Sequence, residues 1–267
     1  MAGANQRLPN SSGSDKPDPA RPSPKEMDVS RVTQLLGCGN IREEHGMLRW
    51  SSNYTFLVSI ADPECQTLAV YKPQRGERPL WDFPDGTLCY REVAAYQVSE
   101  ALGWKLVPPT ILRDGPRGLG SVQLFIHNDP GVNYFSLTLD DVLQPQLERV
   151  AAFDYIINNA DRKGGHCLLD NDKHLWGIDH GISFHTAPKL RTVIWDFAGQ
   201  RIPESVLSDL QRLCSALDQS DGPVRTELQN LLSDAELYAF MARIRRMIQR
   251  REYPRPGPGP NYPWPPV

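Results

Sequence analysis

The sequence has no hydrophobic run that approaches the roughly 20 residues needed to cross a bilayer. Near Met1 it also lacks the hydrophobic segment of a signal peptide, so we expect neither a transmembrane segment nor export. Cysteine is sparse. The five cysteines are scattered and show no Cys-x-x-Cys spacing, which argues against a disulfide framework and a cysteine-based zinc site. Together these absences predict a cytoplasmic protein with reduced thiols.

A strong charge of either sign is absent as well. The formal net charge is −3 at pH 7, which gives no global reason to bind nucleic acid or an anionic membrane. We therefore expect no nucleic-acid partner. One local exception is the basic stretch near the C-terminus, which is typical of a solvated helix face and also leaves peripheral contact with phospholipid open. Its residues are Arg243, Arg245, Arg246, Arg250 and Arg251.

Both ends of the chain differ in composition from the middle. Residues 1–26 contain almost no bulky apolar side chain, so we expect a disordered N-terminal tail. Residues 252–267 form a proline-rich C-terminal tail with polyproline II character. We favour a loose tail there. Binding of this tail to a protein partner, and packing of Trp264 back onto the domain, remain alternatives.

Residues 27–126 read as a β-rich lobe. The run 54–60 is rich in aromatic and β-branched residues, and a turn around Asp62-Pro63 leads to a returning strand at 68–72. Apolar residues at helical spacing predict a helix over 90–102 that ends at Gly103. Two further strands are expected at 108–112 and 120–126.

Residues 127–251 read as a larger α-rich lobe. A broad apolar stripe predicts a long helix over 140–158. Two short strands are expected at 167–169 and about 175–178, and three more helices at about 203–217, 223–232 and 234–250. The sequence therefore predicts an α+β protein with the two-lobed division of a protein kinase and a hinge near 124–128.

Two aspartates stand out in the second lobe. Asp161 follows the long predicted helix, Asp179 follows an apolar run, and each is followed by glycine within a few residues. A carboxylate held between apolar and glycine-rich flanks suits proton abstraction or metal binding. Phosphoryl transfer needs two such carboxylates, one to orient the attacking hydroxyl and one to bind the metal ion. Lys72 lies inside an apolar strand, where an ammonium needs an anionic partner, and Glu92 on the following helix is the candidate.

These motifs resemble the phosphoinositide 3/4-kinase-like superfamily, which includes the type II phosphatidylinositol 4-kinases and the HipA-type kinases. The resemblance spans roughly residues 45–200 and extends to small actinobacterial members. The strings that share it are Ser52-Asn53, Val70-Tyr71-Lys72-Pro73, Arg91-Glu92-Val93-Ala94-Ala95-Tyr96, Asn159-Ala160-Asp161-Arg162-Lys163 and Ile178-Asp179.

The resemblance implies ATP and a divalent metal as cofactors, and transfer of the γ-phosphoryl group to a hydroxyl acceptor. It assigns Asp161, Lys72 and Glu92 to catalysis and Asp179 to the metal. Ser51, Ser52 and Asn53 replace a glycine-rich phosphate loop. The adenine would contact the strand end that contains Gln123, Leu124, Phe125 and Ile126.

His166 departs from the family pattern, because an asparagine usually ligates the metal at this place. Neutral imidazole suits Mn²⁺ better than Mg²⁺, so the metal is expected to be Mg²⁺ or Mn²⁺. An unperturbed imidazole would also lose the metal below about pH 6.5. The change leaves a pseudokinase open, in which the protein is a nucleotide-binding or partner-binding module.

A metallohydrolase is a weaker alternative, in which His174, His180 and His185 join His166 and Asp179, although no His-Glu-x-x-His spacing supports it. For the kinase reading, the acceptor stays open among a lipid, a protein and a small molecule, because the fold does not decide it.

Overall fold

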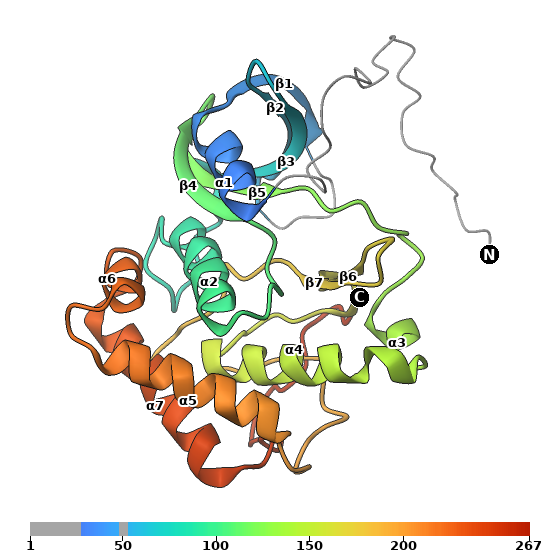
Figure 1. The fold of residues 1–267 in the computed structure, drawn as a ribbon, viewed down its shortest axis with the longest axis vertical. Coiled ribbons are helices and arrows are strands. Elements are labelled where there is room, and N and C mark those ends of the chain that lie inside the picture. Colours follow the sequence, from blue (N-terminus) through green and yellow to red (C-terminus); the bar gives the residue numbers. More distant parts are fainter. Residues whose placement is uncertain (1–27, 48–52) are drawn as a thin grey trace.

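The structure, a computed structural model, describes residues 28–47 and 53–267. The predicted disordered tail and two of the predicted phosphate-loop residues, Ser51 and Ser52, lie outside the described residues. Over the described part, the chain forms a small antiparallel sheet above a larger group of helices (Figure 1), which confirms the predicted two-lobed α+β class. The lobe boundaries themselves stay a prediction.

A five-stranded antiparallel sheet makes up the smaller lobe, in the strand order β1-β2-β3-β5-β4. Its core combines buried sheet residues such as Val58, Ile60 and Tyr71 with Leu35 and Leu36 of helix α1. The elements are α1 (Val29–Cys38), β1 (Asn40–Met47), β2 (Phe56–Ala61), β3 (Gln66–Pro73), β4 (Thr110–Gly115) and β5 (Gly118–Leu124).

Side-chain alternation along β3 places the strand lysine. Tyr71 and Pro73 are buried, and Lys72 between them is only partly buried on the opposite face of the strand. Successive side chains of a strand point to opposite faces of the sheet. Because Tyr71 points into the sheet core, Lys72 points away from that core. Lys72 pairs with Ser121 of β5, so it lies on an interior strand of the sheet.

Helix α2 (Leu88–Leu102) lies between the sheet and the other helices (Figure 1). It has buried residues on nearly every side, and it ends where Gly103 adopts the left-handed conformation that glycine accepts most easily. Arg91 at its start is 1% exposed and donates to Glu236 of the last helix at 2.5 Å. Glu92, the next residue, turns toward the cleft below the sheet.

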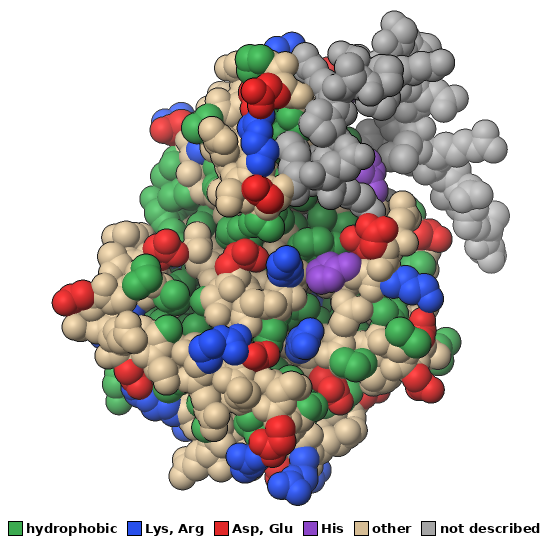
Figure 2. Space-filling model, viewed as in Figure 1, with side chains coloured by type: hydrophobic (Ala, Val, Ile, Leu, Met, Phe, Trp, Pro, Cys, Tyr) green, Lys and Arg blue, Asp and Glu red, His purple; other side chains and the backbone are tan. Residues whose placement is uncertain are grey.

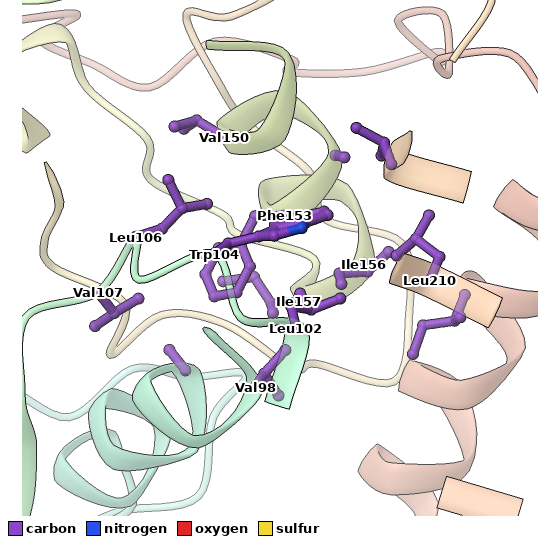
Figure 3. Close-up of a cluster of buried hydrophobic side chains, with 14 of the residues drawn as sticks. Val98, Leu102, Trp104, Leu106, Val107, Val150, Phe153, Ile156, Ile157 and Leu210 are labelled. Carbon is purple, nitrogen blue, oxygen red and sulfur yellow. The ribbon is translucent and has the colours of Figure 1, made fainter. Parts of the chain in front are cut away.

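The larger lobe has one continuous apolar core that includes residues of α2. Figure 3 shows part of it, where Phe153, Ile156 and Ile157 lie among side chains from α2, from residues 104–107 and from α5. Trp104 also donates its indole N–H to Asp209 at 2.7 Å. The elements are α3 (Tyr134–Leu137), α4 (Gln144–Ile157), β6 (Cys167–Leu169), β7 (Leu175–Gly177), α5 (Glu204–Asp218), α6 (Pro223–Gln229) and α7 (Asp234–Arg250), with short 3₁₀ turns η2 (Gln74–Gly76), η3 (Asp141–Leu143) and η4 (Gly164–His166).

The expected elements are present, with shifted ends, and three elements were missed, namely α1, β1 and the short helix α3. The helix predicted over 140–158 begins as η3 and becomes regular only at Gln144, with Pro145 in its first turn. Helix α1 and strand β1 were not anticipated. Strand β1 is almost fully exposed in its burial pattern, so its sequence lacks the apolar alternation by which strands are recognised.

The favoured interpretation of the proline-rich C-terminal tail as a loose segment is wrong, because the tail is attached to the larger lobe. Tyr253 is buried, and the backbone oxygens of Tyr253, Asn261 and Pro266 all accept hydrogen bonds from the larger lobe. Trp264 does not pack back onto the domain, because it is 89% exposed. Beyond Tyr253, whose side chain joins the apolar core, the tail is held by its backbone, which a search for apolar side chains cannot detect. No helix among the described residues is long and apolar enough to span a membrane.

Candidate active site

One cleft between the lobes collects the side chains that the sequence singled out. Lys72 and Glu92 line it from the β3 and α2 side, and Asp161, His166 and Asp179 line it from the side of the larger lobe. Figure 2 shows acidic, basic and histidine side chains close together across the middle of this face, below the sheet. The convergence that the chain order predicted is therefore present in the fold.

Lys72 is the centre of the cleft. Its ammonium donates to Glu92 Oε1 at 2.5 Å and also to Asp179 Oδ1. Burial alone would lower the pKa of Lys72, but the two carboxylates raise it above its usual value, so the side chain stays a cation. The same ammonium holds the pKa of Asp179 well below its usual range against the opposing effect of burial. The Lys72 ammonium thus faces two carboxylates, those of Glu92 and Asp179.

Asp161 is presented by the turn that ends α4. Asn158 closes the helix in the left-handed conformation, and Asn159 accepts from the Asp161 N–H at 3.0 Å through its side-chain oxygen. Burial raises the pKa of Asp161, and the Lys163 ammonium, 3.5 Å from its carboxylate, opposes that rise. A carboxylate with a raised pKa in a cleft is suited to accept a proton from an acceptor hydroxyl.

A buried ion pair supports this turn from behind, and the sequence reasoning missed it. Arg162 and Asp154 are almost completely buried and joined by several hydrogen bonds of 2.9–3.1 Å. Arg162 also donates to the carbonyl oxygens of His166 at 3.2 Å and Ile178 at 2.9 Å. One guanidinium therefore joins α4, the loop with His166 and the residue before Asp179. The sequence offered one signal for this ion pair, because Asp154 lies inside the apolar stripe of the predicted helix over 140–158.

Asp179 and His166 form the predicted metal position. Asp179 is a non-glycine residue with φ of 59°, and its Oδ2 lies 3.4 Å from His166 Nε2. Two ligands of one divalent ion lie about 3 Å apart when each bond is about 2.1 Å, so this pair fits a shared ion. Among residues 28–47 and 53–267, no group of three or more histidine, cysteine or acidic side chains is arranged to hold a metal. Such a site suits an ion that takes its remaining ligands from phosphate and water.

The pH expectation for His166 needs correction. Burial lowers the pKa of His166 to about 4, although the nearby carboxylate of Asp179 opposes this. The imidazole is therefore neutral and able to ligate well below the pH of 6.5 that an exposed histidine would impose. The sequence could not show this, because the shift comes from burial between the two aspartate loops.

The expected nucleotide-binding residues are only partly brought to the cleft. Asn53 lines it and accepts from the Arg78 N–H at 2.9 Å. The predicted adenine-binding stretch lies outside the lining residues. Within it, the Leu124 N–H donates to Pro109 O, the Phe125 N–H donates to Leu68 O, and the Gln123 side chain donates to Thr110. Adenine binding by Gln123, Leu124, Phe125 and Ile126 stays a prediction.

Two further residues, Glu77 and His180, contact groups of the site, and neither was assigned a role in a kinase site from the sequence. Glu77 lines the cleft and accepts from the first N–H groups of α2, those of Leu88 at 3.0 Å and Cys89 at 2.8 Å. The His180 N–H donates to Glu92 Oε2 at 2.9 Å, and its ring lies 2.6 Å from Arg162 Nη2. His180 therefore connects the cleft with the buried ion pair.

The metallohydrolase alternative finds no support in this geometry. His174 is directed to the carbonyl oxygen of Lys105 at 2.8 Å, and the ring of His185 packs against Phe83. Neither joins His166 and Asp179 in a ligand cluster within the described residues.

A small sheet over a helical lobe, with a strand lysine paired to a helix glutamate and two aspartate loops below, defines the class of kinase-like proteins. The chain belongs to the phosphatidylinositol 3- and 4-kinase family, because the model of that family matches residues 21–233.

A relative of known sequence supports the family, and a solved structure supports the fold. The chain is 38% identical over 256 residues to Protein Rv2133c of Mycobacterium tuberculosis (strain ATCC 25618 / H37Rv), covering 82% of this chain and 90% of that protein. The crystal structure of the Helicobacter pylori proinflammatory kinase CtkA matches with a TM-score of 0.50 and 14% identity. That match covers 82% of this chain and 94% of CtkA, and supports the fold alone.

Proposed function

We propose that the protein is an ATP-dependent phosphotransferase that transfers the γ-phosphoryl group to a hydroxyl of an acceptor. The observation that carries this proposal is the single cleft in which Lys72 contacts both Glu92 and Asp179 while Asp161 lines the same space. Membership of a kinase family supports it. The cytoplasm is the compartment that we propose, on the composition of the chain.

Each side chain has a role that its surroundings suit. Lys72, held by Glu92, would contact the nucleotide phosphates, and Asn53 at the mouth of the cleft would contact them from the sheet side. Asp161, with its raised pKa, would accept the proton of the acceptor hydroxyl as the new oxygen–phosphorus bond forms and the bond from the γ-phosphorus to the bridging oxygen breaks, so that ADP leaves. Asp179 and His166 would hold Mg²⁺ or Mn²⁺, which supplies positive charge to the transferred phosphoryl group.

The acceptor class is open among a lipid, a protein and a small molecule. The family is named for kinases of a lipid, phosphatidylinositol, which favours a phosphoinositide as the first acceptor to test. A basic face on α7 would suit an anionic membrane surface, since Arg245 and Arg246 are exposed there. Fractionation of labelled products would separate the three classes directly.

A second candidate is a nucleotide-binding module without turnover. Two observations favour it: a histidine stands where the family has a metal-binding asparagine, and Lys72 is bonded directly to the proposed metal ligand Asp179. Such a module would bind nucleotide and metal yet leave the γ-phosphate in place.

Transfer of label from γ-labelled ATP tests the proposal. Purified protein is mixed with fractionated cell lipids, proteins and small molecules in Mg²⁺ and in Mn²⁺, and nucleotide binding is followed by thermal shift. We expect labelling that falls by roughly 10²- to 10⁴-fold in Asp161→Asn, the range for loss of a general base, and is lost in Asp179→Asn.

Asp221→Asn is the matched control, because Asp221 is an exposed aspartate between α5 and α6. It should label as the wild type does. Nucleotide binding without labelling in the wild type would support the module instead. Labelling that survives unchanged in both Asp161→Asn and Asp179→Asn would refute the assigned roles.

A further inference from the structure

The C-terminal tail follows a defined path along the larger lobe toward the cleft. After α7, Tyr253 is 4% exposed, its carbonyl oxygen accepts from the Gly199 N–H at 3.0 Å, and its hydroxyl donates to Glu148 O at 3.1 Å. These contacts fasten the start of the tail to α4 and to the segment before α5. The proline-rich part begins from a fixed point.

Asn261 is the second attachment point. Its carbonyl oxygen accepts two hydrogen bonds, from the Thr192 N–H at 3.0 Å and from the indole N–H of Trp195 at 3.1 Å. Its own side-chain amide donates to Gly257 O at 2.7 Å and Gly259 O at 2.9 Å. One asparagine therefore shapes the glycine-rich turn of the tail and presents its backbone to the 192–195 segment.

The third attachment point is in the catalytic loop itself. The Gly164 N–H donates to Pro266 O at 2.8 Å, and Gly164 lies between Asp161 and His166 in the chain. A side chain at Gly164 would come within 3.0 Å of the ring of Phe135 and within 3.5 Å of Pro266 O. The loop is therefore packed closely between Phe135 of α3 and the tail.

The segment around Thr192 connects the second and third points. Thr192 forms a parallel bridge with Arg162, whose N–H donates to Arg191 O at 3.0 Å and whose carbonyl accepts from the Val193 N–H at 3.1 Å. Residues 191–193 thus lie between the catalytic loop on one side and Asn261 on the other. The tail supports the loop directly at Gly164 and indirectly through this segment.

We propose that residues 251–266, named here the C-terminal strap, are a positioning element of the catalytic loop. The loop 163–166 contains two adjacent glycines, so its own sequence does little to restrict its conformation. Hydrogen bonds from outside must then fix the distance between Asp161 and His166. The strap supplies some of them through backbone groups, in addition to the bond from Arg162 to His166 O, and the exposed side chain of Trp264 takes no part in any of the three attachment points. This inference rests on the proposed function for its effect on catalysis.

Deletion of residues 261–267 from the full chain tests the strap, since it removes the second and third attachment points and keeps Tyr253. We expect faster amide hydrogen exchange in peptides covering residues 160–168. We also expect phosphoryl transfer to fall roughly 10- to 100-fold, as for a catalytic group displaced by up to about 1 Å. The thermal shift produced by ATP should change little, because Lys72 and Glu92 do not touch the strap.

If the deletion lowers overall stability, two point variants still test the role of the strap. Trp195→Phe removes only the indole donor to Asn261 O and should move exchange and turnover in the same direction by a smaller factor. Trp264→Ala removes an exposed side chain and keeps all three attachment points, so it should match the wild type in both measurements.

The exchange measurement decides the structural part independently of activity. If the wild type shows no transfer, the proposed function fails, and exchange at 160–168 alone supports or overturns the strap. Unchanged exchange in the deletion variant overturns the proposal. So does a loss of turnover in Trp264→Ala equal to that in the deletion, because the tail would then act through its exposed surface and not as a support.

Discussion

Two networks of charged side chains lie on either side of the catalytic loop, and they differ in exposure and in bonding. Behind the loop, the side chains of Arg162 and Asp154 are 0% and 1% exposed, and the guanidinium also bonds to two carbonyl oxygens. In the cleft, the side chain of Asp179 is 40% exposed, and Lys72 bridges it to Glu92. The first network lies inside the protein, whereas the second is open to the cleft at Asp179, although the side chains of Lys72 and Glu92 are only 16% and 6% exposed.

This difference separates support from chemistry. A buried pair with every bond made is costly to break, since the remaining partner becomes an unpaired buried charge. A partly exposed cluster can exchange partners with a ligand at a smaller cost. The four predictions below test that division, from the largest expected effect to the smallest.

Loss of the buried carboxylate should give the largest effect. In Asp154→Asn the Arg162 guanidinium loses its counter-charge inside the core, so the free energy of unfolding should fall by about 3–5 kcal/mol. Urea denaturation measures this. A loss below about 1 kcal/mol would show that the pair is not the support of the loop and would break the comparison.

Exchange of the cleft cation should affect activity and spare stability. Lys72→Arg keeps a positive charge between Glu92 and Asp179 but replaces a compact ammonium with a planar fork. We expect turnover to fall by roughly 10²- to 10³-fold, as when one preorganised donor is removed from an active site. The free energy of unfolding should stay within about 1 kcal/mol. A large loss of stability with normal turnover would reverse the roles of the two networks.

His166 lies where the two networks meet, and its effect should depend on pH. Its pKa is about 4 in the folded protein and about 6.5 in an unfolded chain. Between these values the unfolded chain binds more protons, so the folded state loses stability as the pH falls from about 6.5 toward 4. Between pH 7.5 and 5 the wild type should lose about 2 kcal/mol more than His166→Asn. Denaturation in metal-free buffer at both pH values checks this, and parallel losses would contradict it.

A surface pair supplies the smallest effect. Arg245 and Asp218 are 2.5 Å apart, and their side chains are about half exposed. Because water and salt screen such a pair, Asp218→Asn should change the free energy of unfolding by less than about 1 kcal/mol and leave turnover unchanged. A larger effect would mean that distance, and not burial, decides the strength of the ion pairs in this protein.

Much of the site could be predicted because its chemistry is local in the sequence. Lys72 is conspicuous as a charge inside an apolar strand, and Asp161 and Asp179 are conspicuous as carboxylates beside glycines. Each of these signals needs only a short window. The fold class followed from the same kind of pattern, since an apolar period near 3.6 residues distinguishes the helices of the larger lobe from the aromatic and β-branched runs of the smaller one.

The remaining features depend on contacts between distant segments. The bonds of Arg162 reach back to Asp154 and forward to Ile178, and no short window contains all three. The pKa of His166 is set by burial, which appears only after folding. Strand β1 has too few apolar residues to be recognised, and beyond Tyr253 the strap is attached through backbone atoms that every residue has.

The bond between Arg91 and Glu236 limits how this protein can be controlled. Arg91 fastens α2 to α7, while its neighbour Glu92 holds Lys72. Many kinases switch off by swinging the corresponding helix outward, which separates the lysine from the glutamate. Here, outward movement of α2 would separate the Arg91 guanidinium, which is 1% exposed, from Glu236. That would leave a buried charge unpaired, at a cost of several kcal/mol. The buried pair therefore opposes regulation through rotation of α2.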